Sequence, residues 1–91
     1  MVGQEAQLWA RGLPRWHLAV DEQALDEYVS LTNAGDARGL GRMIEQGRAF
    51  PVADETRVMV LDQKHLAMQV RILEGPQAGK TGWVAFEHVR Y

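Results

Sequence analysis

The segment Gly79-Lys80-Thr81 has the residues that end a nucleotide-binding phosphate loop, in which a lysine and backbone amides hold phosphate oxygens. Such a loop has four residues between its two glycines, whereas only three separate Gly75 from Gly79. Glu74 occupies the position of the first glycine, where a carboxylate repels phosphate. The residues after Thr81 are strand-like, although a phosphate loop must lead into a helix. Because both glycines permit a positive φ, the segment predicts a turn beside a hairpin and no nucleotide site.

The other side chains that commonly carry chemistry are scattered along the chain. His17, His65 and His88 lie far apart, and no pair of them has the spacing of metal ligands. Ser30 is the only serine, and no base with an orienting acid lies near it in the sequence. The absence of cysteine excludes disulfides, thiolate metal sites and cysteine nucleophiles. We therefore predict that the protein is not an enzyme and has no cofactor or metal.

Composition and charge narrow the classes of protein to which the chain can belong. The 91 residues include ten basic and twelve acidic side chains, and residues 21–49 hold six of those acids against three arginines. Nucleic-acid binding needs uncompensated cations, so this balance disfavours a nucleic-acid partner without excluding one. No apolar run reaches about eighteen residues, and the first residues lack the pattern of a signal peptide. We expect a single soluble domain that does not span a membrane.

A helical hairpin is predicted over residues 21–47. Apolar side chains recur at intervals of three and four after Asp21, which can cap the first helix. Gly35 breaks that helix, and Asp36 can cap a second one. Gly47 is a natural end for the second helix.

Residues 1–20 are predicted to form an arm, because their apolar side chains follow no clear period. Trp9 and Trp16 are the notable residues in it, since a large aromatic side chain rarely stays exposed without a contact. These rings can dock on the body of the protein or on a partner. The arm and the helices are the surfaces through which we expect any oligomer to form.

From about residue 50 the spacing of apolar side chains changes to that of strands. Apolar and other residues alternate in residues 56–61 and 66–73, and a strand-like run at 81–86 follows the glycine-rich turn. Gly82 has no side chain and leaves room for another backbone to approach closely. Short runs joined by tight turns predict a small antiparallel barrel.

Three patterns in the β-rich half point to a known family: Thr56-x-Val58-x-Val60-Leu61, Val70-Arg71-Ile72-Leu73, and Gly79-Lys80-Thr81-Gly82-Trp83-Val84 with a later Val89. Over residues 50–91 they resemble the bacterial SH3-like domain. The resemblance implies a small barrel in which Phe86-Glu87-His88 form a 3₁₀ turn. It also implies non-catalytic binding, often of cell-wall peptides or protein segments. The chain departs from the family in its first strand, of which residues 48–53 supply only part, and in its helical hairpin.

The hairpin of residues 70–84 is also similar to the KOW element of transcription and ribosomal proteins, which has a strand, Gly-Pro, a glycine and a second strand. This second resemblance implies the same barrel, but contact with RNA or proteins. Arg71, Lys80 and Arg90 are the cations that would contact RNA, together with the ring of Trp83. Because acidic residues lie close to these cations in the sequence, the SH3-like interpretation is the leading one.

The predicted binding residues are Trp83, Thr81, Arg71 and Tyr91. Alternate side chains of a strand share a face, so Trp83 and Thr81 point away from the barrel if Val84 points into it. Trp83 can then line a binding groove, or it can be covered by the helices together with Tyr91. Both alternatives for Trp83 follow from the sequence.

The sequence thus predicts an α+β fold in which an N-terminal helical hairpin (residues 21–49) packs on a small SH3-like antiparallel β-barrel (50–91), preceded by the arm (1–20). The predicted function is a non-catalytic interaction module for a peptide, protein or cell-wall fragment in the bacterial cytoplasm or cell envelope. A KOW-like module for nucleic acid or ribonucleoprotein is the alternative. The predicted core comprises Leu25, Tyr28, Val29, Leu40, Met43, Ile44, Val58, Val60, Met68, Val70, Ile72, Val84 and Val89.

Overall fold

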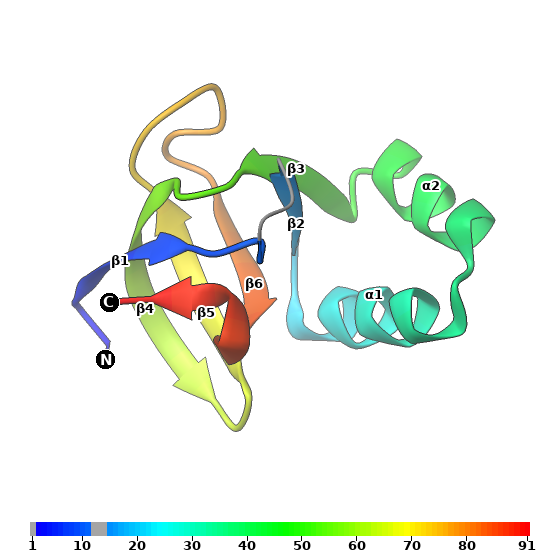
Figure 1. The fold of residues 1–91 in the computed structure, drawn as a ribbon, viewed down its shortest axis with the longest axis horizontal. Helices are drawn as coiled ribbons and strands as arrows, with labels where there is room; N and C mark the ends of the chain where they lie inside the picture. Colours follow the sequence, from blue (N-terminus) through cyan, green and yellow to red (C-terminus); the bar gives the residue numbers. More distant parts are fainter. Residues whose placement is uncertain (1, 12–14) are drawn as a thin grey trace.

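The computed structural model describes residues 2–11 and 15–91. Within them the chain forms seven strands, two α-helices and one turn of 3₁₀ helix (Figure 1). The strands are β1 (Glu5–Leu8), β2 (Arg15–Ala19), β3 (Ala49–Ala53), β4 (Arg57–Lys64), β5 (Ala67–Ile72), β6 (Thr81–Ala85) and β7 (Val89–Arg90). The helices are α1 (Glu22–Ala34) and α2 (Ala37–Glu45), and the 3₁₀ turn is η1 (Phe86–His88).

The seven strands form one sheet in the order β3-β2-β6-β5-β4-β1-β7. All neighbours are antiparallel, and the consecutive strands β4, β5 and β6 occupy its centre. On one side β1 pairs with both β4 and β7, so the first and last strands of the chain lie together (Figure 1). On the other side β2 pairs with β6 and β3.

The helical hairpin is an insertion between two strands of the sheet. Helices α1 and α2 follow β2 and precede β3, and these two strands pair with each other from Arg15–Ala53 to Ala19–Ala49. The prediction of an N-terminal hairpin on a small barrel is therefore wrong. It failed because two strands precede the helices, and neither strand has a strong local signal.

Both of those strands come from the segment predicted to be an arm. Residues 5–8 alternate between exposed and buried side chains, and Ala6 and Leu8 enter the core. Leu8 pairs with Val89 near the other end of the chain, and a pairing at that separation has no signal in a four-residue segment. Residues 12–14 of the predicted arm lie outside the described residues. Residues 48–53 mostly belong to β3, an edge strand beside β2.

The two helices are present in the predicted region and use the predicted caps. The carboxylate of Asp21 accepts a hydrogen bond from the Ala24 amide at 2.7 Å, and that of Asp36 accepts one from Gly39 at 2.9 Å. Gly35 ends α1 in the left-handed conformation, with a φ of 67°. A side-chain cap contributes about 1 kcal/mol to stability, so these local signals are strong enough to be read from sequence.

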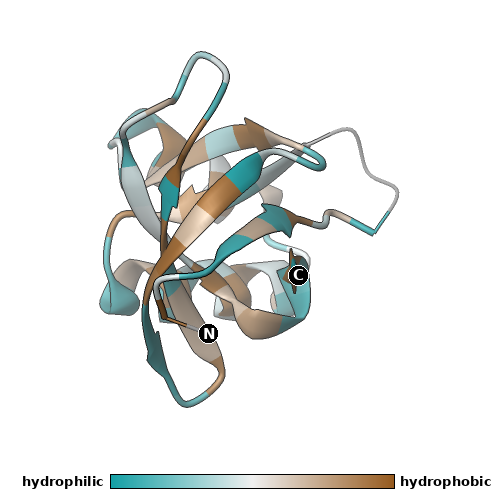
Figure 2. Ribbon diagram, turned by 90° about the vertical axis from the view of Figure 1, so that its left-hand side faces the viewer, coloured by the Kyte–Doolittle hydropathy of each residue, from teal (hydrophilic) through white to brown (hydrophobic). Residues whose placement is uncertain are grey.

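One face of the sheet encloses the main core. Buried side chains from six strands pack into a single cluster, so the sheet must coil around them (Figure 2). The cluster comprises Ala6, Leu8, Leu18, Val52, Val58, Val60, Met68, Val70, Ile72 and Val84. Burying a Val, Leu or Ile side chain stabilises the fold by about 1.5–3 kcal/mol, which makes this cluster the main source of cohesion.

The second core lies between the sheet and the helices. Residues that alternate with the first cluster, such as Ala19 beside Leu18 and Trp83 beside Val84, point to the helices instead. This cluster comprises Ala19, Ala24, Leu25, Tyr28, Met43, Ala49 and Trp83. The central part of the sheet is therefore covered on both faces.

Proline protects the free edge of β3. The Val20 amide donates to the Arg48 carbonyl at 3.0 Å, and hydrogen-bonded pairs alternate along antiparallel strands. His17 and Pro51 lie three pairs further along and therefore form a pair without hydrogen bonds. In such a pair the nitrogen of Pro51 points away from β2. Because proline has no N–H, this edge lacks a central donor for an added strand.

Gly82 is predicted to be essential where β2 crosses close to β6. A Cβ at this position would lie 2.8 Å from the Cβ of Leu18 and 3.1 Å from the carbonyl oxygen of Ala19, which confirms the close approach expected from sequence. Gly82→Ala should lower the free energy of unfolding in urea by about 1–3 kcal/mol. Gly41→Ala is the matched control, because a Cβ at Gly41 of α2 meets nothing within 4 Å. The control should raise stability by about 1 kcal/mol. Equal effects of Gly82→Ala and Gly41→Ala on stability would contradict the close approach of β2 to Gly82.

A candidate ligand groove beside helix α1

The predicted binding residues do not converge on one site. Arg71 and Thr81 lie opposite each other on β5 and β6, and both side chains are exposed. Trp83 is on the same face but is covered. Tyr91, 62% exposed, follows β7, whose only partner in the sheet is β1. Strand pairing therefore brings together Arg71 and Thr81, but not Tyr91.

Trp83 belongs to the second core. Its side chain is only 7% exposed and packs with residues of both helices. Of the two alternatives that the sequence leaves open for Trp83, the helices therefore cover it. The Nζ atom of Lys64 lies 5.9 Å from the centre of its ring and is also paired with Glu22 at 3.0 Å. Trp83 lines none of the three hollows described below.

The glycine-rich loop that follows β5 is a turn, as predicted. Gly75 and Gly79 have φ values of 81° and 90°, which side chains disfavour. The Gly79 amide donates to the Ile72 carbonyl at 2.8 Å, and the chain then enters β6 without any helix.

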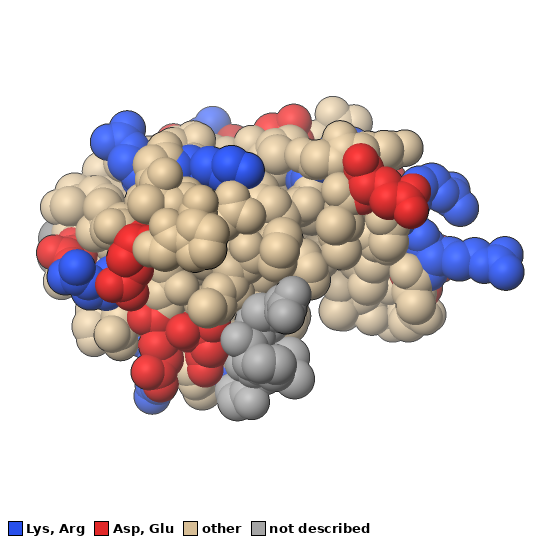
Figure 3. All heavy atoms as spheres, turned by 90° about the horizontal axis from the view of Figure 1, so that it is seen from above, with Lys and Arg blue, Asp and Glu red and all other residues tan. Residues whose placement is uncertain are grey.

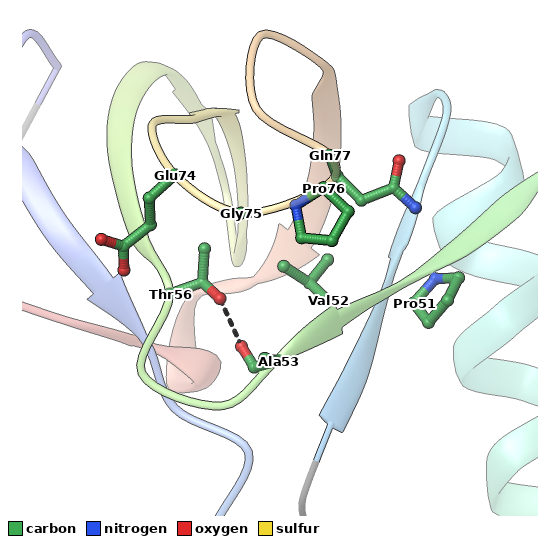
Figure 4. Close-up of a pocket in the computed structure, with 8 residues that line it drawn as sticks. All are labelled: Pro51, Val52, Ala53, Thr56, Glu74, Gly75, Pro76 and Gln77. Carbon is green, nitrogen blue, oxygen red and sulfur yellow. Dashed lines mark hydrogen bonds between the residues drawn. The ribbon is translucent and has the colours of Figure 1, made fainter.

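A shallow hollow of about 330 Å³ lies between this loop and β3 (Figure 4). Its walls include Pro51, Val52 and Pro76. The Thr56 hydroxyl donates to the Ala53 carbonyl at 2.7 Å. The Glu74 carboxylate instead accepts hydrogen bonds from the backbone amide and the Nε of Arg57, and these bonds lower the pKa of Glu74. These polar groups are used within the fold, so they are not set to orient a ligand.

A longer depression runs beside α1, and we call it the α1 groove. It consists of two adjoining hollows of about 540 and 100 Å³, which share Leu25, Val29, Ala85 and Glu87. One wall is the α1 face that carries Leu25 and Val29. The other wall is formed by the β4–β5 turn and by η1.

Aromatic rings form one end of the groove. The Trp16 ring stacks on His88 with 4.2 Å between ring centres, and it meets Tyr28 edge-on at 5.9 Å. His88 is buried, and its Nδ1 lies 2.9 Å from the carbonyl oxygen of Trp9, so Nδ1 carries the donated hydrogen. Tyr28 Oη lies 3.2 Å from Nδ1 of His17, and burial raises the pKa of Tyr28. These contacts hold the rings in one arrangement.

The other end of the groove is apolar and open. Leu66 is 69% exposed, Phe86 is 47% exposed and Val29 is 40% exposed. The Phe86 amide donates to the Leu66 carbonyl at 2.8 Å, which ties the β4–β5 turn to η1. His65 has a φ of 53° in that turn, a conformation that His adopts more readily than bulky or β-branched residues.

Carboxylates border the same open end. Glu22 and Asp26 lie on the helix wall, and Glu87 lies on the opposite wall. Glu22 pairs with Lys64, and Glu87 pairs with Arg11 at 3.4 Å. Both pairs are solvent-exposed and contribute little to stability. The groove thus combines apolar walls with an acidic border, a combination that sequence reasoning missed because its parts lie on separate elements.

Comparison with known proteins gives no match: no family model, curated protein or solved structure is significantly similar to this chain. The similarity to SH3-like and KOW domains therefore stays a proposal. Neither α1 nor α2 is long and apolar enough to cross a membrane. In residues 2–11 and 15–91, no three acidic or histidine side chains are grouped as metal ligands.

The assignment of Trp83 to the core and Phe86 to the groove predicts different effects of truncation. Trp83→Ala should reduce the free energy of unfolding by about 3–5 kcal/mol, because it empties the space between α1 and the sheet. Phe86→Ala should cost roughly 1 kcal/mol, since about half of the ring is already in water. Urea unfolding followed by circular dichroism measures both. A larger loss of stability for Phe86→Ala than for Trp83→Ala would contradict the assignment of Trp83 to the core and Phe86 to the groove.

Proposed function

We propose that this protein is a non-catalytic interaction module that binds an extended segment of another protein in the α1 groove. The observation that carries the proposal is the exposure of Leu66, Phe86 and Val29 on the two facing walls. Apolar side chains that stay exposed beside one another mark a contact surface. A bound segment would remove them from water.

The aromatic end supports the same proposal. Trp16, Tyr28 and His88 are held by contacts with one another and with the backbone of Trp9. Rings that are already ordered lose little conformational entropy when a ligand covers them. Tyr28 and His88 are themselves buried, so the half-buried ring of Trp16 is the one that an apolar side chain of a ligand can cover at this end.

The length of α1 suits a short extended segment. Its 13 residues span about 20 Å along the helix axis. An extended chain advances about 3.3 Å per residue, so about six residues can follow the groove from end to end. A segment of this size can fill both hollows.

The lining favours protein over the other predicted ligands. Cell-wall sugars carry many hydroxyl groups that must keep hydrogen bonds when buried, and the apolar side chains exposed at the open end, Leu66, Phe86 and Val29, offer none. Nucleic acid would bring phosphates to Glu22, Asp26 and Glu87. On the face shown in Figure 3 the cations are interspersed with acids and form no continuous basic surface.

The resemblance to bacterial SH3-like domains supports binding without catalysis. Strands β4, β5 and β6 are followed by η1 and the short β7, which agrees with the order that the resemblance implies for residues 50–91. Phe86-Glu87-His88 form the 3₁₀ turn expected from it, and this turn borders the groove.

A peptide-display selection tests the proposal. A library of random peptides of about eight residues, a little longer than the groove, is selected against the full chain. Selected peptides should shift the amide resonances of Val29, Leu66 and Phe86 in NMR titrations. Leu66→Ser should weaken their binding about tenfold or more, because it removes the apolar contact without adding a charge.

Val2→Ser is the control, since Val2 is also apolar and exposed but does not line the groove. If no selected peptide depends on Leu66, the proposal is wrong. Groove shifts caused by peptidoglycan fragments, but not by peptides, would identify a cell-wall ligand instead. Shifts at Arg71 and Thr81 with single-stranded RNA, weakening as salt increases, would favour the KOW-like alternative.

A further inference from the structure

We infer that the segment bound in the α1 groove is basic as well as apolar, and that Asp26 selects its positive charge. This inference rests on the proposed function, because it concerns the chemistry of the partner at the same groove. It is carried by the imbalance of charge around the groove and by the position of Asp26 beside the apolar contacts.

The charge imbalance is clear among the described residues that line the groove. Three carboxylates, on Glu22, Asp26 and Glu87, are set against the single ammonium group of Lys64. Lys64 is already committed to Glu22 at 3.0 Å, and this contact raises the pKa of Lys64. The lysine is therefore charged and occupied when a ligand arrives.

Asp26 differs from the other two acids. Glu87 is paired with Arg11, whereas Asp26 forms no ion pair with any Lys, Arg or His side chain that the structure describes. Asp26 is exposed to solvent. A cation brought by a ligand can pair with Asp26 without breaking an existing ion pair.

The helix places this acid next to the apolar contacts. Glu22, Asp26 and Val29 follow one another at intervals of four and three residues, so they share one edge of α1. Asp26 and Val29 are about 4.5 Å apart along the helix axis. One or two residues of an extended segment cover this distance, so a cation should lie that close to an apolar anchor.

Lysine and arginine fit both features at once. Their methylene stems can lie on Leu25 and Val29 while the charged group reaches the carboxylate. An acidic segment would be repelled by Asp26, whereas Glu22 and Glu87 are already paired with Lys64 and Arg11. A neutral segment would gain the apolar contacts but nothing from Asp26.

The selected peptides give a direct test. Among peptides that depend on Leu66, Lys and Arg should be enriched over the starting library, and selection against Asp26→Lys should enrich Asp and Glu instead. One selected peptide and its Arg→Gln or Lys→Gln version are then titrated against the native protein and Asp26→Asn. The native protein should bind the basic peptide about two- to fivefold more tightly than its neutral version, as expected for an exposed ion pair. Asp26→Asn should remove this difference.

Glu45→Gln is the matched control, because Glu45 is an exposed acid on α2 that does not line the groove. It should leave the preference for the basic peptide unchanged. Peptides that depend on Leu66 without any excess of Lys or Arg would overturn this inference while leaving groove binding intact. An equal preference in native protein and Asp26→Asn would overturn the role of Asp26. The absence of any peptide that depends on Leu66 would overturn the proposed function itself.

A second copy of the chain is the alternative occupant, although it would bring a helix and not an extended segment: α2 carries Arg38 and Arg42 with an exposed Ile44. Groove resonances that shift with protein concentration, without peptide, would identify the partner as another copy. If Asp26→Asn or salt then weakened the association, the basic character of the partner would be supported; if neither did, it would be overturned.

Discussion

The structure depends on strand β6 being buried on both of its faces. Val84 points into the core that the sheet encloses, and Trp83 points into the core beneath the helices. Gly82 has no side chain, which lets Leu18 and Ala19 of β2 approach closely. Three consecutive residues thus connect the coiled sheet, the crossing strand and the helical insertion. Each needs a different side chain for a steric reason, so the segment has little freedom to vary.

The position of the α1 groove follows from this packing. Trp83 packs with Leu25 and Tyr28 and holds α1 against the sheet. The adjoining edge of the helix, with Asp26 and Val29, then faces the β4–β5 turn and η1 across a gap. The same helix therefore supplies the second core and one wall of the groove, and a change in its packing would alter both.

The aromatic end of the groove joins distant parts of the chain. Trp16 comes from β2, Tyr28 from α1 and His88 from η1, while His88 is also bonded to the backbone of Trp9 after β1. A surface assembled from three elements and the segment after β1 is rigid only while the fold is intact. The open end is tied together by the hydrogen bond from the Phe86 amide to the Leu66 carbonyl, and its apolar side chains are exposed. We infer that the groove pairs a fixed contact surface with a more adaptable one.

Much of the local structure could be predicted from the sequence. The caps of both helices, the glycine turn and the close approach at Gly82 depend on residues within a few positions of one another or on the size of one side chain. The order of strands depends on pairings such as Leu8 with Val89, which no short segment reveals. Val29 has the spacing of a core residue yet is exposed in the groove, and Trp83 is covered by the helices. The sequence by itself determined the helices, the central strands and their turns, because those signals are local. Only the tertiary structure decided which apolar side chains stay in contact with water, because that depends on which distant elements cover them.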